Sequence, residues 1–257
     1  IFYVNDKPHI GHAYTSVAAD ALARWRRLRG DDVFFLTGTD EHGSKIAQAA
    51  QKAAKSNQEF VDDLSTQFKS LKDSLNLSWD SFFRTTDKKN HWPGAQALWK
   101  KLEAAGDIYE KEYKGLYCVG CEAFLNERDL VNGVCTDHKK EPEVIEEKNL
   151  FFKLSKYGEQ IQKVIESGEL DIQPETRRNE ILSLIKSGLE DVSFSRPKDK
   201  VDWGIPVPEH EDQIMYVWCD ALSNYINAVG YPEDGTSFNK WWPADIHMIG
   251  KDILRFH

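Results

Sequence analysis

The spacing of apolar positions in the first third of the chain predicts alternating strands and helices. Residues 1–4 are a short β-rich run, and a helical pattern extends from His9 to about residue 29. The continuous apolar run at residues 33–36 is typical of a strand buried on both faces of a parallel sheet. Residues 37–43 then read as a loop, and a long helical pattern follows to about residue 75. This rhythm predicts a βαβ unit.

The pattern changes after residue 106. A strand at residues 81–84 and a helix ending near Gly106 complete half of an open α/β domain. Between residues 109 and 154 the segments are short and separated by turn residues, and a charged helical region then continues to about Leu189. This stretch predicts a small inserted module.

Buried-strand patterns return near the end of the chain. Residues 201–208 are proline-rich and extended, residues 214–218 read as a buried strand, a helix follows from Asp220, and residues 246–249 read as another strand. We therefore predict an α/β fold with a split Rossmann-type parallel sheet. Its parts are a first half at residues 1–106, an inserted connective module at 107–200 and a truncated second half at 201–257.

Composition narrows the class of protein. The chain has 257 residues and a net charge of −9, which argues against a generic nucleic-acid coat. The basic group at positions 24, 26, 27 and 29 is better explained as a solvated helix face than as an RNA contact. No apolar run approaches the roughly 18 residues that span a bilayer, so we expect no membrane partner.

The ends of the chain indicate a fragment. It begins with Ile1 rather than methionine and stops at His257 inside an apolar-patterned segment. The first residues already read as a strand, so no signal peptide is visible. The sequence does not indicate an oligomeric state.

Three of the four cysteines lie close to a histidine in a metal-ligand pattern. Cys118 and Cys121 form one short-spaced pair, and Cys135 and His138 form a second pair after thirteen residues. This spacing suits zinc, and four protein ligands would close the site, which predicts a structural metal. Free surface thiols are the alternative, whereas a disulfide framework fits the small cysteine count poorly.

The run Pro8-His9-Ile10-Gly11-His12 follows the first strand and opens the first helix. Unpaired N–H groups at a helix N-terminus suit phosphate, and two imidazoles on one face can donate hydrogen bonds to a triphosphate. Gly11 leaves room for a base or ribose. Two surface histidines on a helix cap are the alternative, but α/β folds bind ligands at this turn.

Two further runs follow predicted strands. In residues 37–43, Thr-Gly-Thr-Asp-Glu-His-Gly, the carboxylate of Asp40 suits an ammonium group, and an acidic helix cap is the alternative. Residues 216–221, Tyr-Val-Trp-Cys-Asp-Ala, together with Tyr225, offer aromatic edges to a thioether. An aromatic core at a strand end competes with that interpretation.

The run at residues 8–12 resembles the HIGH signature of class I aminoacyl-tRNA synthetases. The runs at 37–43 and 216–221 are similar to those of methionyl-tRNA synthetases. The resemblance covers the whole chain through five segments in the family's order, and the single metal knuckle fits bacterial and organellar members best. It implies that L-methionine attacks ATP, with Mg²⁺, to give methionyl-adenylate and pyrophosphate, and that tRNA(Met) then takes the methionyl group. It also implies a structural Zn²⁺ in the module that approaches the tRNA.

The resemblance implies roles for single residues. Asp40 would hold the α-amino group, with Glu41 and His42 as supporting polar groups. The catalytic residues would be His9, His12 and Asp40, and the ATP-binding residues His9, Gly11, His12, Gly250 and Asp252. The methionine-binding residues would be Ile1, Tyr3, Asp40, Trp218, Ala221, Leu222, Tyr225, Ile253 and His257. Arg196 also matches a position near the site, with a surface arginine as the alternative.

The sequence departs from the family in two places. Cys219 stands where an aliphatic residue or phenylalanine is more frequent. The second signature, Lys-Met-Ser-Lys-Ser, and the helical anticodon-binding domain are absent and would lie downstream of His257, so we expect the isolated fragment to be weakly active or inactive. Two alternatives remain: a class I synthetase for cysteine, leucine or isoleucine, and a non-catalytic protein that binds RNA through the zinc module. We expect a cytoplasmic protein, or one of an organellar matrix if a transit peptide precedes this segment.

Overall fold

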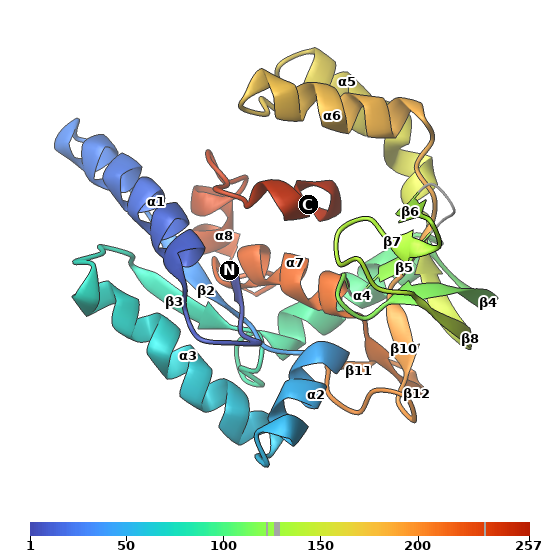
Figure 1. The fold of residues 1–257 in the computed structure, drawn as a ribbon. Helices are drawn as coiled ribbons and strands as arrows, with labels where there is room; N and C mark the ends of the chain where they lie inside the picture. Colours follow the sequence, from blue (N-terminus) through green and yellow to red (C-terminus); the bar gives the residue numbers. More distant parts are fainter. Residues whose placement is uncertain (122, 126–128, 234) are drawn as a thin grey trace.

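A parallel sheet lies at the centre of the first half of the chain. The computed structural model describes residues 1–121, 123–125, 129–233 and 235–257. The sheet has the order β1-β2-β3, with β1 at Phe2–Tyr3, β2 at Leu36–Asp40 and β3 at Ser81–Arg84 (Figure 1). Both pairs are parallel, and Tyr3 pairs with Asp40. The predicted α/β architecture with a parallel sheet is confirmed.

The first helix forms as the sequence predicts. Helix α1 spans Ile10–Leu28 between β1 and β2, and its polar face is bonded to the segment before β3. Asp20 accepts hydrogen bonds from Ser78, and Arg27 forms an ion pair with Asp80. Arg24 and Arg26 pair with Asp20 and Asp31. Three of the four arginines of this basic group are therefore held by carboxylates of the chain itself.

The predicted long helix after β2 is two helices. Helix α2 ends at Lys52, and Ser56 caps the following helix in a capping box with Glu59, so the polar Ser56 starts a new helix instead of continuing the first. Helix α4 follows β3. The bounds are α2 Ser44–Lys52, α3 Asn57–Ser74 and α4 Trp92–Ala104.

The predicted strand at residues 33–36 is displaced toward the C-terminus. Strand β2 begins only at Leu36, which pairs with Ser81, the first residue of β3. Among the described residues no strand extends far enough to pair with residues 33–35, and a strand needs such a partner. Asp40 therefore belongs to the strand and not to the loop that follows it.

The middle of the chain builds a separate antiparallel sheet of order β5-β4-β8-β9, beside a small hairpin, β6-β7 (Figure 1). A helical pair, α5 and α6, lies apart from the sheets at the top of the view and packs around Ile165, Leu182 and Ile185. The bounds are β4 Ile108–Cys118, β5 Ala123–Leu125, β6 Leu130–Val131, β7 Val134–Cys135, β8 Glu143–Phe152, η2 Leu154–Tyr157, α5 Gly158–Glu166, α6 Glu175–Lys186 and β9 Val192–Ser193.

The two strands predicted for the second half are wrong in detail. Strand β12 ends at Met215 and is antiparallel to its neighbours, because a two-residue connection joins it to β11 and allows only a hairpin. Trp218 lies inside helix α7 instead of a strand. Residues 246–249 pair with no described strand, and Ile246 and Met248 are 54% and 45% exposed. The bounds are β10 Ser195–Pro197, β11 Pro206–Val207, β12 His210–Met215, α7 Val217–Asn227, α8 Gly235–Trp241 and η3 Lys251–Phe256.

Two apolar clusters fix the elements around the parallel sheet. One joins β1, α2 and α3 through Val4, Ile46 and Phe68. The other joins α4 to the second half of the chain, with Trp99 and Met215 at its centre. Helix α7 is thereby packed against α4 and crosses the middle of the molecule (Figure 1).

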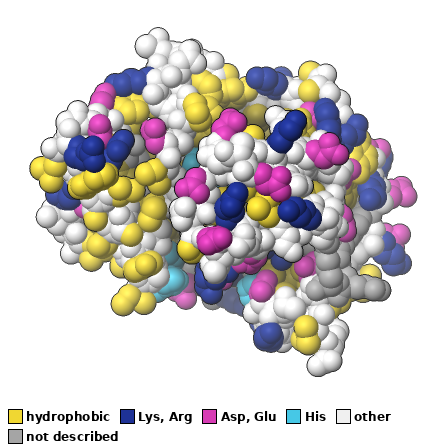
Figure 2. All heavy atoms as spheres, turned by 90° about the horizontal axis from the view of Figure 1, so that it is seen from above, with side chains coloured by type: hydrophobic (Ala, Val, Ile, Leu, Met, Phe, Trp, Pro, Cys, Tyr) yellow, Lys and Arg dark blue, Asp and Glu magenta, His cyan; other side chains and the backbone are white. Residues whose placement is uncertain are grey.

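The surface carries charges of both signs. Figure 2 shows Lys and Arg side chains interspersed with Asp and Glu on the face seen from above, without a patch of a single sign. None of the described helices combines the length and the apolar character that crossing a bilayer requires.

Gly38 is the tightest backbone contact in the parallel sheet. A Cβ atom on this residue would lie 1.8 Å from the carbonyl oxygen of Phe83, so strands β2 and β3 would have to separate. We predict that Gly38→Ala lowers the free energy of unfolding by about 1–3 kcal/mol in urea titrations. Gly158→Ala is the matched control, since the nearest atom there is 3.8 Å away. Equal stability of the two variants would contradict this account.

Candidate functional site

His9 and His12 form a stacked pair at the start of α1. Their ring centroids are 3.8 Å apart, and His9 is the N-cap residue. The Nδ1 atom of His9 accepts a hydrogen bond from the Gly11 backbone N–H, and the Nδ1 atom of His12 accepts one from the His9 backbone N–H. Because both Nδ1 atoms are acceptors, each neutral ring carries its proton on Nε2. The pair therefore offers two Nε2–H donors at a helix N-terminus.

The surroundings of His12 keep its ring neutral. Burial lowers the pKa of His12 to about 4, and the neighbouring His9 adds to the effect. The ring lies edge-on against Phe2 and Phe68. A neutral ring keeps Nδ1 available to the His9 backbone, which protonation would prevent.

Packing against His9, in addition to space for a ligand, explains why position 11 is a glycine. A Cβ atom there would lie 2.9 Å from Cε1 of His9, so any side chain would displace the ring from its capping position. The sequence predicts only open space at this position, and the structure adds the packing of His9.

Asp40 ends strand β2 and is buried. Its backbone oxygen accepts a hydrogen bond from Val4, which places it beside β1. Burial raises the pKa of Tyr225 to about 12, and the negative charge of Asp40 contributes in the same direction. The negative charge of Asp40 therefore acts on the hydroxyl of Tyr225 in α7. Helix α2 is capped by Gly43, so the alternative role of Asp40 as a helix cap is wrong.

Glu41 follows Asp40 but points into the protein, where it is fully buried. Arg84 donates two hydrogen bonds to it, at 2.7 and 2.9 Å, and Thr39 donates a third at 2.5 Å. Thr86 also bonds to this carboxylate. Glu41 therefore anchors the loop after β2 to strand β3.

The aromatic residues predicted for the thioether pocket meet in space. Trp218 stacks on Phe256 with ring centroids 4.5 Å apart, and its edge faces His257. The hydroxyl of Tyr225 lies 3.0 Å from Nε2 of His257 and 3.5 Å from the backbone nitrogen of Ile1. The structure thus brings β1, α7 and the C-terminal segment together.

The remaining predicted pocket residues lie on the same three elements. Tyr3 packs in the cluster that contains Trp218, and Ala221 is buried in α7 beside the partly buried Leu222. Ile253 is linked to His257, whose Nδ1 lies 3.0 Å from the Ile253 carbonyl oxygen. Burial lowers the pKa of His257 to about 4, which keeps this ring neutral as well.

Gly250 and Asp252, predicted for adenosine and ribose, lie at the start of η3. Gly250 is its N-cap residue, and both residues are exposed. Two aromatic residues of the same region, Phe256 and His247, were missed by sequence reasoning. His247 packs edge-on against Tyr225, and only its position beside the predicted residues could have indicated it.

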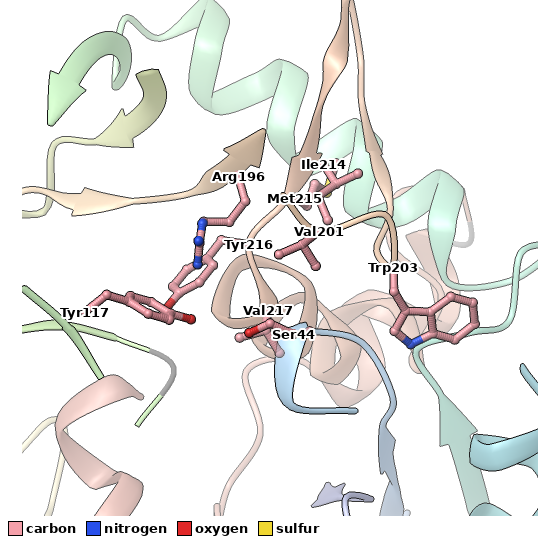
Figure 3. A pocket seen from close by; sticks show the side chains of 10 residues that line it. Ser44, Tyr117, Arg196, Val201, Trp203, Ile214, Met215, Tyr216 and Val217 are labelled. Atoms are coloured by element: carbon pink, nitrogen blue, oxygen red, sulfur yellow. The ribbon is translucent and has the colours of Figure 1, made fainter. Parts of the chain in front are cut away.

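Arg196 is buried, so its interpretation as a surface arginine is wrong. Its guanidinium donates two hydrogen bonds to Glu147, at 2.8 and 2.7 Å, and lies 4.5 Å above the ring of Tyr117. Figure 3 shows it pointing toward Tyr117 and Tyr216, and all three residues line one small cavity. The loop after β2 also lines this cavity through Gly43 and Ser44.

The predicted zinc ligands converge. The ligand atoms of Cys118, Cys121, Cys135 and His138 all lie within 4.8 Å of one another. The Sγ atoms of Cys121 and Cys135 are 3.6 Å apart, too far for a disulfide bond of about 2.05 Å. Tetrahedral Zn–S bonds of about 2.3 Å place two sulfurs roughly 3.7 Å apart, so this donor set fits zinc.

Comparison with known proteins finds relatives whose descriptions agree with one another. The methionine–tRNA ligase of Thermotoga maritima is 48% identical over 261 residues, an alignment that covers all of this chain and 41% of the relative. The structure of methionyl-tRNA synthetase from Mycobacterium tuberculosis bound by methionyl-adenylate has a TM-score of 0.94 and 46% identity. Its free form has a TM-score of 0.82 and 42% identity. This chain covers 51% of each of these two structures.

The chain thus spans about half or less of the length of the relatives it matches. The family described as tRNA synthetases class I (M) matches residues 1–141 and 127–257, which together include every position. The chain belongs to this family, the class I (M) tRNA synthetases.

Proposed function

We propose that the chain is the catalytic part of a methionine–tRNA ligase. Such an enzyme activates L-methionine with ATP, releases pyrophosphate and passes the methionyl group from the adenylate to tRNA(Met). One observation carries the proposal: the buried Asp40 pairs in the sheet with Tyr3 of the aromatic pocket, and the N-terminus of α1 bears two histidines whose Nδ1 atoms accept backbone hydrogen bonds. An ammonium group, a thioether and a phosphate chain therefore each meet a matching surface.

The chemistry needs no nucleophilic side chain. Asp40 binds the ammonium group, and Trp218 and Tyr225 enclose the thioether, so the substrate carboxylate is directed toward ATP. A carboxylate oxygen attacks the α-phosphorus, and the bond to the β-phosphate oxygen breaks to give pyrophosphate. The Nε2–H groups of His9 and His12 stabilise the charge that develops on the phosphates. Mg²⁺ bound with ATP would neutralise part of the triphosphate charge, and Gly250 and Asp252 would receive the adenosine.

The inserted module serves the second step of the reaction. We propose the division 1–106, 107–200 and 201–257, which the antiparallel sheet β5-β4-β8-β9 and the pair α5 and α6 support, because all of these elements lie within residues 107–200. Strand β10 of this range pairs instead with β12 of the third part. Cys118, Cys121, Cys135 and His138 would hold a structural zinc that stabilises this module, which would approach the tRNA acceptor end. Zinc takes no part in the chemistry.

We predict that the full-length protein exchanges pyrophosphate into ATP only when methionine is supplied. Asp40→Asn removes the charge that binds ammonium, and we expect it to raise the KM for methionine by about tenfold to a hundredfold, since bonds to charged groups contribute about 1.5–3 kcal/mol. The assay supplies each amino acid singly. Exchange with cysteine, leucine or isoleucine would overturn the substrate. Silence with all amino acids would favour a non-catalytic RNA-binding protein.

The low pKa of His12 predicts a pH dependence of stability. In the unfolded chain this ring binds a proton near pH 6.5, but in the folded chain only near pH 4. The contribution of the neutral His12 ring to the free energy of unfolding is therefore complete above about pH 6.5 and is lost as the pH falls toward 4. His12→Asn keeps an acceptor for the His9 backbone but does not titrate, so it should lose less stability than the wild type between pH 7 and pH 5 in urea titrations. An equal loss would show that His12 titrates normally.

Zinc content tests the role of the knuckle. We predict one zinc per chain by metal analysis, and loss of that zinc together with a lower melting temperature in Cys135→Ser, because three donors hold a structural zinc poorly. Cys219→Ser is the matched control, since this buried cysteine lies in α7 outside the cluster. A protein that purifies without zinc, or a control that also loses it, would refute the assignment.

A further inference from the structure

Asp220 is a fully buried carboxylate in the first turn of α7, the helix that carries Trp218 and Tyr225. Both of its oxygens are occupied by imidazoles from other parts of the chain. Oδ2 lies 2.5 Å from Nδ1 of His42, and Oδ1 lies 2.6 Å from Nε2 of His91. Each histidine is itself buried, so water screens neither contact.

The proton positions on His91 follow from its second partner. The side-chain nitrogen of Asn227, which can only donate, lies 3.0 Å from Nδ1 of His91 and 3.1 Å from its carbonyl oxygen. Nδ1 therefore accepts, and Nε2 carries the proton that is donated to Asp220. Burial alone would raise the pKa of Asp220, but the interactions with His42 and His91 outweigh burial and lower this pKa.

His42 belongs to the loop that begins directly after Asp40, two residues away. Trp203 also bonds to this loop. Its Nε1 atom donates a hydrogen bond to the Glu41 carbonyl oxygen at 2.6 Å, and its backbone carbonyl oxygen accepts one from the Gly43 backbone N–H at 3.3 Å. The His42 ring lies edge-on against the Trp203 ring with centroids 5.1 Å apart. The loop is thus clamped between Trp203 and Asp220.

We propose that Asp220, acting through His42 and His91, is a positioning residue that sets the distance between the ammonium site at Asp40 and the thioether pocket on α7. The inference rests on the proposed function. One carboxylate joins the Asp40 loop, the N-cap residue of α4 and the pocket helix, so a shift of the loop relative to α7 would break a buried, charge-assisted bond. The affinity for a substrate that must reach both sites depends on that distance, whereas the affinity for ATP at the start of α1 does not.

The test is pyrophosphate exchange by the full-length protein, with separate KM values for methionine and ATP. We expect His42→Ala to raise the KM for methionine about tenfold or more and to change the KM for ATP by less than about twofold, since small displacements of a bound substrate are costly. His42→Asn should restore most of the affinity, because the asparagine Nδ2 atom replaces the Nδ1 donor of histidine. His210→Ala, which removes a partly exposed pair with Glu103, is the matched control and should behave as the wild type.

The outcomes separate the two proposals. A fall in kcat with unchanged KM values would mean that His42→Ala only reduces the amount of folded protein, and it would overturn the positioning role. Failure of His42→Asn to restore the KM would overturn it as well. Asp220→Ala and His91→Gln extend the test to the other two residues that bond with His42 or with Asp220. The melting temperature of each variant is measured beside its KM values. Absence of methionine-dependent exchange in the wild type would instead refute the proposed function, and this inference with it.

Discussion

The loop after β2 depends on charges that are buried and fully paired. Glu41 and Asp220 are both 0% exposed, and an unpaired carboxylate in such a place would destabilise the fold by several kcal/mol. Arg84 pairs with Glu41, while His42 and His91 bond to Asp220. These bonds attach the loop to β3, α4 and α7 at once. Asp40, held between them, therefore has a fixed position at the edge of the sheet.

The proposed function assigns recognition of an ammonium group and recognition of a triphosphate to two different parts of the site. Under the proposed function, Asp40 would supply negative charge for an ammonium group. The histidines of α1 supply hydrogen-bond donors without full charge, because their Nδ1 atoms are engaged by the backbone and the pKa of His12 is low. Neutral donors at a helix N-terminus suit charge that develops during the reaction.

Local sequence patterns predicted the elements whose signals are local. The start of helix α1 at His9 depends on residues a few positions apart, and the zinc ligands span only 20 positions; both form as predicted. The strands at residues 33–36 and 246–249 were wrong because pairing, which defines a strand, depends on distant partners. The bonds of Asp220 were missed for the same reason: its histidines lie 178 and 129 residues away in the sequence. Arg196 was placed near the site, but its burial follows only from the fold.

A crystal structure of the full-length protein with methionine tests the central claim most directly, because it shows both ends of the substrate at once. This account predicts the ammonium group within hydrogen-bond distance of the Asp40 carboxylate and the thioether between Trp218 and Tyr225, with the His42–Asp220 bond intact. Methionine bound elsewhere, or bound in the aromatic pocket with its ammonium group turned away from Asp40, would contradict it.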